Sequence, residues 1–129
     1  MAHHIGTDII EISRIEKAIN RWGEHFLRRV YTQPELSRYG GSPQSLAARF
    51  AGKEAVIKLL GGGEGGLAWR EIEILSQPNG KPLLNLYGRA RHQANRLGIK
   101  EIAVSLAHSK EHAIASAIGT TEAGDAGER

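Results

Sequence analysis

The chain has 129 residues, the length of one domain, and 17 basic against 14 acidic residues give a formal charge of +3. Its 40% hydrophobic and 24% charged residues are ordinary for a globular protein and argue against disorder along the whole chain. It has no cysteine, which excludes disulfides, thiolate metal sites and a cysteine nucleophile, and fits a reducing compartment. The charge is too small to indicate a nucleic-acid binder, although it suits phosphates or an acidic partner. Without a signal peptide or an apolar run of ~20 residues, we expect a soluble cytoplasmic protein.

The chain begins with a predicted strand and an amphipathic helix. Residues 5–12 are rich in β-branched side chains, which favour a strand. Ser13 and Glu16 have the spacing of a capping box, which predicts the start of a helix. Gly23 can interrupt that helix near its middle. Steps of three and four mark its expected buried stripe: Ile12, Ile15, Ile19, Trp22, Phe26 and Val30.

Two further helices are expected in the first half of the chain. Thr32 and Glu35 form a second capping-box pattern, which predicts a short helix that ends at residues 40–41. Residues 45–60 predict the longest helix, and Gly61 is a natural stop for it.

After a glycine-rich loop at 61–66, the hydrophobic period changes to that of strands. The pattern predicts a strand at 69–75, a turn at 77–80, a strand at 81–86, a helix at 87–97, and strands at 101–108 and 112–118. We therefore expect a single α+β domain over residues 1–118, with an antiparallel sheet packed with a long central helix. Residues 119–129 are small and polar and predict a flexible tail.

Two carboxylates stand out in this pattern. Asp8 interrupts a mostly apolar strand, so its charge must be paired, hydrogen-bonded or bound to a cation. Glu54 lies on a helix face of small residues, with Lys58 one turn later. Taken alone, Asp8 is more often a turn cap, and Glu54 with Lys58 is more often an exposed ion pair. One carboxylate from a strand and one from a helix, completed by water and phosphate oxygens, is nevertheless a usual Mg²⁺ site, with Lys58 as a charge for a phosphate.

Three segments carry a resemblance to a known family: GTDIIEI at 6–12, RFAGKEAVIK at 49–58 and SLAHSK at 105–110. Over residues 2–118 the sequence resembles the bacterial holo-acyl-carrier-protein synthases, the small single-domain members of the 4′-phosphopantetheinyl transferase superfamily. The resemblance implies transfer of 4′-phosphopantetheine from coenzyme A to a serine of apo acyl carrier protein, with release of adenosine 3′,5′-bisphosphate. Such an enzyme serves fatty acid biosynthesis.

The resemblance also implies roles for single residues. Asp8 and Glu54 match the pair that binds Mg²⁺, and together with Lys58 they are the expected catalytic set. Glu54 or a metal-bound water is the expected base for the serine. Position 57 departs from the family, which often has serine there, so we expect no such contact from Ile57. Coenzyme A contacts are expected from Lys58, Gly61, Asn79, Gly80, Pro82, His108 and Ser109. The asparagine–glycine pair also predicts a hairpin turn, and the two roles are compatible.

Four basic residues lie on the side of the first helix away from its apolar stripe: Arg14, Lys17, Arg21 and Arg28. From spacing alone, such a face is most often only solvated. In the family the corresponding helix docks the acidic acyl carrier protein, so these residues are the expected partner-binding surface. The resemblance further implies a homotrimer with active sites between subunits.

Two other functions fit parts of the sequence. A nucleic-acid-binding module would use the basic helix, but the chain has no aromatic stacking set and only a small positive charge. A structural subunit of a larger synthase complex would use the carboxylates only to pair with basic neighbours. The transferase is favoured over both, and we expect neither nucleic-acid nor membrane binding.

Overall fold

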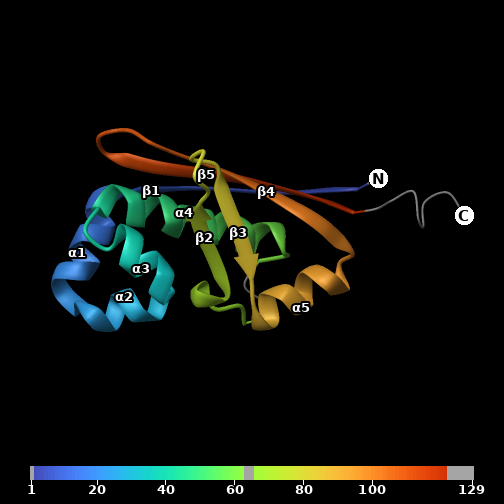
Figure 1. Ribbon diagram of the computed structural model, residues 1–129, viewed down its shortest axis with the longest axis horizontal. Coiled ribbons are helices and arrows are strands. Elements are labelled where there is room, and N and C mark those ends of the chain that lie inside the picture. Colours follow the sequence, from blue (N-terminus) through green and yellow to red (C-terminus); the bar gives the residue numbers. More distant parts are fainter. Residues whose placement is uncertain (1, 63–65, 122–129) are drawn as a thin grey trace, which may run out of the picture.

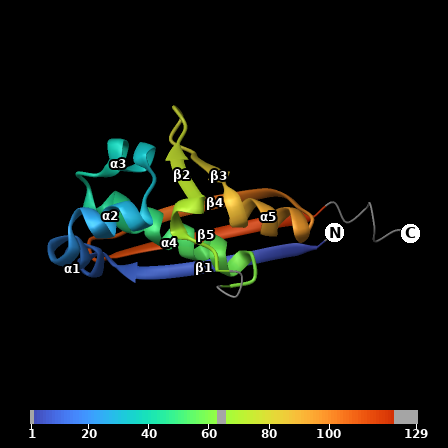
Figure 2. The same ribbon diagram turned by 90° about the horizontal axis from the view of Figure 1, so that it is seen from below.

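The computed structural model describes residues 2–62 and 66–121 (Figures 1 and 2). Its helices are α1 (Ile12–Trp22), α2 (Glu24–Val30), α3 (Gln33–Tyr39), α4 (Pro43–Leu59) and α5 (Gly88–Arg96). Its strands are β1 (His3–Glu11), β2 (Ile72–Ser76), β3 (Pro82–Leu86), β4 (Ile99–His108) and β5 (His112–Thr121). A 3₁₀ turn, Trp69–Glu71, precedes β2. Within these residues no helix is long and apolar enough to cross a lipid bilayer.

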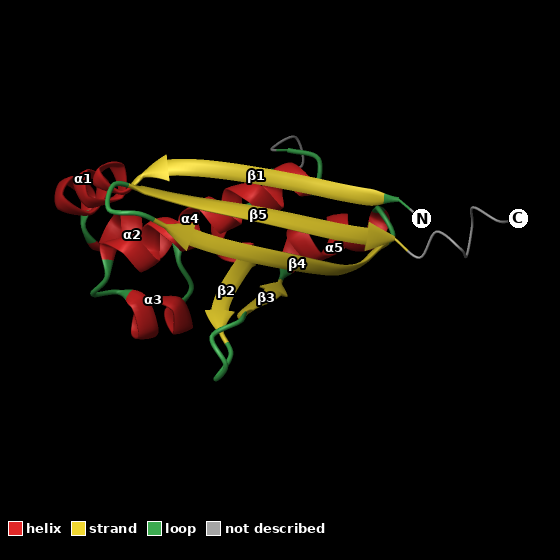
Figure 3. Ribbon diagram, turned by 90° about the horizontal axis from the view of Figure 1, so that it is seen from above, coloured by secondary structure: helices red, strands yellow, loops and turns green. Residues whose placement is uncertain are grey.

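The strands form antiparallel sheets. β5 lies between β1 and β4 in a three-stranded sheet, while β2 and β3 form a separate hairpin. β1 pairs with β5 along its whole length, with Asp8 opposite Ala115. Figure 3 shows the three strands side by side, with α4 behind them. The expected α+β fold, in which antiparallel strands pack with a long central helix, is confirmed.

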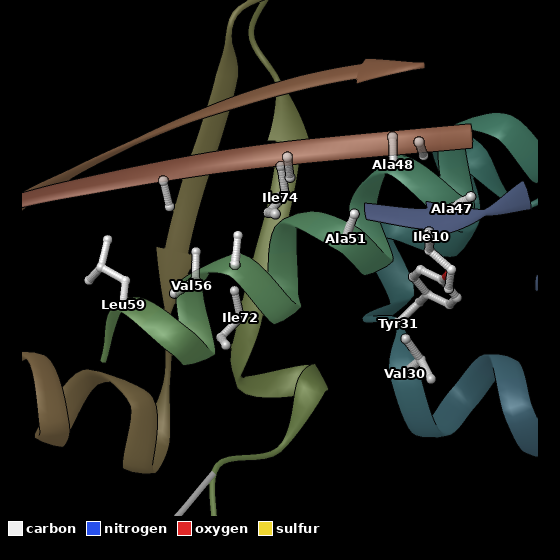
Figure 4. Packing of buried hydrophobic residues seen from close by; sticks show 14 of the residues in the cluster. Ile10, Val30, Tyr31, Ala47, Ala48, Ala51, Val56, Leu59, Ile72 and Ile74 are labelled. Carbon is white, nitrogen blue, oxygen red and sulfur yellow. The ribbon is translucent and has the colours of Figure 1, made fainter. Parts of the chain in front are cut away.

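α4 forms the centre of the fold because strands cover it on two sides. It contacts β1 and β5 of the larger sheet and also β2 of the hairpin. Glycine at position 6 allows a close approach, because a Cβ there would overlap the backbone carbonyl of Ala55. Ile72 and Ile74 of β2, in the hairpin, fill the space next to α4 (Figure 4). Small buried residues make the tight packing possible: Ala47, Ala51 and Ala55 of α4, and Ala113, Ala115 and Ala117 of β5.

The first helix differs from the expected one. Gly23, with φ of 55°, ends α1 and begins α2, so the interruption that the sequence allows is present. Trp22, expected in the buried stripe, is instead 54% exposed, because α1 ends at this residue and the chain turns away. The predicted Ser13 capping box is wrong. β1 runs directly into the helix, whose N-cap is Glu11, without a side-chain cap.

The other elements differ from prediction mainly at their ends. Thr32 and Glu35 form the predicted capping box of α3. Residues 69–71 form a 3₁₀ turn rather than the start of the strand. β5 continues to Thr121, three residues into the expected tail, and the remainder of that tail lies outside the described residues.

Candidate functional site

The site begins with the alternation of side chains along β1. Gly6, Asp8 and Ile10 face inwards, whereas the residues between them are exposed. The Asp8 side chain is only 16% exposed, and its Oδ1 accepts a hydrogen bond from Lys58 Nζ at 3.1 Å. The same ammonium donates to the carbonyl of Thr7 at 2.9 Å. Lys58 therefore joins the end of α4 to the middle of β1.

Glu54 precedes Lys58 by one turn of α4, so the two side chains leave the same side of the helix. The indole Nε1 of Trp69 donates a hydrogen bond to Glu54 Oε2 at 2.6 Å. Lys58 pairs with Asp8, rather than forming the exposed pair with Glu54 that spacing alone favours. Lys58 therefore has a carboxylate of β1 as its partner and a carboxylate of α4 as its neighbour.

A hollow of about 560 Å³ opens beside these side chains. Glu54 and Lys58 line it from α4, and Arg29 lines it from the last turn of α2. Two cations in one hollow suit an anionic ligand such as a phosphate. Gly61, an expected coenzyme contact, follows α4 with φ of 106° and does not line this hollow. The other lining residues are Ile57, Gly62, Gly66, Leu67, Ala68 and Trp69.

The carboxylates of Asp8 and Glu54 suit a hard divalent cation. Each uses one oxygen in a hydrogen bond, and among the described residues the other oxygen has no protein partner. Residues 2–62 and 66–121 include no cluster of three or more histidine or acidic side chains that could enclose a metal by themselves. A carboxylate pair completed by water and substrate oxygens is usual for Mg²⁺, so the donor set fits this ion.

A second set of expected coenzyme-binding residues gathers elsewhere. Gly80, Pro82 and His108 line a hollow of about 500 Å³ between the β2–β3 turn and the end of β4. Arg49 and Lys81 line the same hollow and add positive charge. This hollow also suits an anionic group.

Asn79 and Ser109 do not line that hollow and shape the turns beside it. Asn79 Oδ1 accepts a hydrogen bond from the backbone N–H of Lys81 at 3.0 Å, and Gly80 takes φ of 89°, which suits glycine. Ser109 Oγ accepts a hydrogen bond from the backbone N–H of His112 at 3.2 Å, within the turn from β4 to β5. The predicted hairpin turn is confirmed, whereas a coenzyme role for these residues stays a prediction.

The two sets of residues lie at opposite edges of the three-stranded sheet. Asp8 belongs to β1 and His108 to β4, with β5 between them (Figure 3). Arg49 and Lys58 of α4 are separated by about 13 Å along the helix axis, at 1.5 Å per residue. One copy of the chain therefore does not bring all the expected coenzyme contacts into one hollow.

The basic residues expected to bind a partner are divided between two helices. Arg28 lies beyond Gly23 on α2, and its guanidinium pairs with Glu24 at 3.0 Å. The continuous basic face expected from the sequence is thus interrupted, because the positive φ of Gly23 changes the direction of the chain. The other three lie exposed on α1: Arg14, Lys17 and Arg21.

Lys53 is a buried residue of the site that no sequence pattern predicted, because lysine is almost never fully buried. Its side chain is 0% exposed, and Nζ donates to Glu35 Oε1 at 2.8 Å, to the carbonyl of Trp69 at 3.1 Å and to the carbonyl of Ile72. Burial lowers the pKa of Lys53, although the Glu35 carboxylate opposes this change. The sequence does place Lys53 next to Glu54, within the segment at 49–58 that resembles the family, and this position could have pointed to it.

Arg29 and Trp69 also have no role in the sequence prediction, yet both line the hollow beside Glu54. Trp69 reaches it because the 3₁₀ turn replaces the predicted strand start. Arg29 has exposed basic neighbours, and no local pattern separates it from them.

Comparisons with known proteins identify the family. The family model of the 4′-phosphopantetheinyl transferase superfamily matches residues 4–118. A holo-[acyl-carrier-protein] synthase of Herpetosiphon aurantiacus is 51% identical over 121 residues, which cover 88% of this chain and 95% of that protein. One from Dehalococcoides mccartyi strain CBDB1 is 54% identical over 115 residues, covering 89% and 96%.

Solved structures show the same relationship. The holo-[acyl-carrier-protein] synthase of Helicobacter pylori, in complex with coenzyme A, has a TM-score of 0.81 at 32% identity and covers 90% of this chain and 99% of that one. The acyl carrier protein synthase of Plasmodium yoelii with ADP bound has a TM-score of 0.84 at 30% identity, covering 95% and 99%. Sequence and fold agree over nearly the whole length. The chain therefore belongs to the 4′-phosphopantetheinyl transferase superfamily, as an enzyme of the holo-[acyl-carrier-protein] synthase family.

Proposed function

We propose that this enzyme transfers 4′-phosphopantetheine from coenzyme A to a serine of apo acyl carrier protein, depends on Mg²⁺ and releases adenosine 3′,5′-bisphosphate. The observation that carries the proposal is the pairing of Asp8 with Lys58, next to Glu54, beside a hollow that also contains Arg29. Relatives named holo-[acyl-carrier-protein] synthase, one of them solved with coenzyme A, support the substrate class.

The reaction moves one phosphoryl group and needs no covalent enzyme intermediate. The serine oxygen forms a bond to the phosphorus that carries pantetheine, while the bond from that phosphorus to the bridging oxygen of the pyrophosphate breaks. The serine gives its proton to the base, Glu54 or a water beside it, and the bridging oxygen leaves with adenosine 3′,5′-bisphosphate. Positioning and charge stabilisation supply most of the catalysis of such a transfer, which suits a chain without a cysteine nucleophile.

Asp8 and the charged residues that line the first hollow divide this work. Asp8 and Glu54 hold the cation through carboxylate oxygens, and when bound, Mg²⁺ neutralises charge on the two phosphates. Lys58 and Arg29 line the hollow from two different helices and would donate hydrogen bonds to the same phosphates. Because Lys58 is held by Asp8 and by the carbonyl of Thr7, its charge is in place before the substrate arrives.

We also propose the homotrimer that the family resemblance implies; the uncovered face of the three-stranded sheet, which Figure 3 views directly, supports contact between copies. Four isoleucines on this face are 41–67% exposed, and they stand opposite each other in two pairs, Ile5 with Ile118 and Ile9 with Ile114. Thr7 lies between the pairs on β1, so the face carries no charge there. Burial against copies of the same chain would remove this apolar surface from water.

Assembly of copies also accounts for the two separate hollows. The β1 edge of one copy carries the residues for the metal and the pyrophosphate. At the β4 edge of a neighbouring copy, His108 is a proposed contact to the nucleotide end of coenzyme A, and Gly80 and Pro82 of the adjacent β2–β3 hairpin are further proposed contacts to the coenzyme. An active site between subunits brings the two sets together.

The carrier protein docks on α1 in this proposal. α1 follows β1 directly, so its exposed Arg14, Lys17 and Arg21 lie on the helix that continues from the strand of Asp8. Acidic groups of the carrier would be steered there and oriented by complementary charge. Arg28 contributes less than the other three, because its charge is already paired on α2.

The proposed transferase domain spans residues 1–118, because every proposed site residue lies within it. Residues 119–129 are the proposed tail, of which 119–121 extend β5. We place the reaction in the cytoplasm, as the step that prepares carrier protein for fatty acid biosynthesis.

Intact-mass measurement of apo acyl carrier protein, after incubation with the enzyme, coenzyme A and Mg²⁺, tests this function. We expect a gain of one phosphopantetheine group, lost on chelation with EDTA and in Glu54→Gln. Glu101→Gln is the matched control, since it removes an exposed carboxylate of β4 and should keep the gain. An unchanged carrier mass with the unaltered enzyme would overturn the proposal.

A further inference from the structure

The indole of Trp69 makes the shortest side-chain hydrogen bond at the proposed metal site. Its Nε1 lies 2.6 Å from Glu54 Oε2, below the usual 2.9–3.0 Å of an N–H···O bond. The bond occupies one oxygen of Glu54, and the second oxygen, without a protein partner among the described residues, is left to bind a cation. The direction of the indole thus decides which oxygen of Glu54 is available.

Trp69 is itself held from several sides. Its ring packs on Phe50 with centroids 5.6 Å apart, and its carbonyl accepts a hydrogen bond from the buried Lys53. The 3₁₀ turn that contains it is closed by Glu71, whose carboxylate accepts the backbone N–H groups of Ala68 and Arg89. These contacts fix both the backbone and the ring, so the indole N–H has a defined direction.

We infer that Trp69 is a positioning residue, which orients the Glu54 carboxylate for the divalent cation through its indole N–H. The inference rests on the proposed function, because it takes Glu54 to be a metal ligand. Groups that hydrogen-bond to ligating carboxylates orient them, and their loss typically lowers metal affinity or activity by about 10- to 100-fold. Lys53 supports this arrangement because its ammonium donates a hydrogen bond to the carbonyl of Trp69.

The variant Trp69→Phe tests this role, because it keeps an aromatic ring beside Phe50 and removes only the N–H donor and part of the ring. We expect the Mg²⁺ concentration for half-maximal transfer to rise about 10- to 100-fold, while kcat at saturating Mg²⁺ changes little. Trp22→Phe is the control, since Trp22 is exposed at the end of α1. An unchanged Mg²⁺ requirement in Trp69→Phe would overturn the inference.

A spectroscopic measurement separates this role from the proposed reaction. The chain has two tryptophans, so Trp22→Phe leaves Trp69 as the only indole N–H in a ¹H–¹⁵N spectrum. We expect this signal to lie at a different position when Glu54→Gln is combined with Trp22→Phe. In Trp22→Phe with Glu54 intact, we expect the signal to shift on addition of Mg²⁺ with coenzyme A. A signal that responds to neither change would overturn the role of Trp69, whatever the activity.

The two failures can be told apart. If the unaltered enzyme transfers phosphopantetheine but the indole signal ignores Glu54→Gln, the positioning role is wrong and the proposed function stands. If no transfer occurs while the indole signal responds to Glu54→Gln and to Mg²⁺, the proposed function is wrong and the positioning of Glu54 is supported.

Discussion

Lys58 Nζ lies 3.1 Å from Asp8 Oδ1, although the two residues are 50 positions apart in the chain. The lysine side chain is 54% exposed and the aspartate side chain 16%, so water reaches the pair from the lysine side. An exposed pair of this kind contributes only about 0.2–1 kcal/mol to folding. Its importance lies in function, because one carboxylate serves both an ammonium and, in our proposal, a metal ion.

Replacement of Lys58 should therefore affect the two ligands in opposite directions. In Lys58→Met, Asp8 loses a competing cation, and we expect Mg²⁺ to bind the enzyme alone about fivefold more tightly, equivalent to ~1 kcal/mol. The same variant loses a charge-assisted bond to phosphate, so the KM for coenzyme A should rise about 10-fold or more. Calorimetric titration with Mg²⁺ and steady-state kinetics measure the two effects. Weaker binding of Mg²⁺ to Lys58→Met would contradict the competition.

Charge reversal on α1 should weaken docking of the carrier protein. We expect the KM for the carrier to rise about 10-fold in Arg14→Glu or Arg21→Glu, since complementary charge mainly speeds encounter. The KM for coenzyme A should stay unchanged. Arg28→Glu is the matched control on α2, and its effect should be smaller because Arg28 is paired with Glu24. Equal effects at Arg21 and Arg28, or a parallel loss of coenzyme A binding, would argue against docking on α1.

A charge on the uncovered sheet face should prevent assembly. Ile118→Lys places an ammonium opposite Ile5 on the apolar face, and we expect sedimentation to show monomers and transfer activity to fall. Leu83→Lys is the control, because Leu83 is also a large exposed apolar residue, 42% exposed, but lies on β3. Trimers of Ile118→Lys, or monomers of Leu83→Lys, would show that another surface joins the copies.

Glu73 should contribute to stability near neutral pH and lose that contribution in acid. Burial alone would raise the pKa of Glu73, but hydrogen bonds from Thr32, Asn85 and Tyr87 outweigh it and lower this pKa. The unfolded chain then binds the proton first as the pH falls, so stability decreases through the window between the unfolded and the folded pKa.

The variant Glu73→Gln should be less stable than the parent by about 1–3 kcal/mol at pH 7, since it weakens a buried set of hydrogen bonds. The difference should shrink as the pH falls below the usual glutamate range. Urea unfolding between pH 3 and pH 7 measures this, with Glu101→Gln as an exposed control. If the difference in unfolding free energy between the parent and Glu73→Gln stays constant in acid, ionised Glu73 is not its source.

Local signals in the sequence predicted most of the fold. The Thr32 capping box, the turn at Gly80 and the small residues of α4 each depend on neighbours within one or two turns, and each is present. These local signals gave wrong predictions where the path of the chain beyond the element determines which side chains are buried. Trp22 follows the apolar spacing of α1 but is exposed, because the chain changes direction at Gly23.

The candidate site could be predicted only in part, for the same reason. Asp8 and Glu54 stand out because each carboxylate is unusual for its local environment. Lys53 and Trp69 form hydrogen bonds with residues of other elements, so their spacing in the sequence does not indicate that they belong to the site. The division of the expected coenzyme contacts between the β1 and β4 edges follows from the strand order, which no single segment encodes.

In the proposed function, Asp8 and Glu54 together bind one divalent cation. Anomalous diffraction from crystals grown with coenzyme A and Mn²⁺ in place of Mg²⁺ tests it most directly. We expect one strong peak at bonding distance from an oxygen of each carboxylate and from the pyrophosphate, and no such peak in Asp8→Asn/Glu54→Gln. Bound coenzyme A with the metal elsewhere, or with no metal at all, would contradict it.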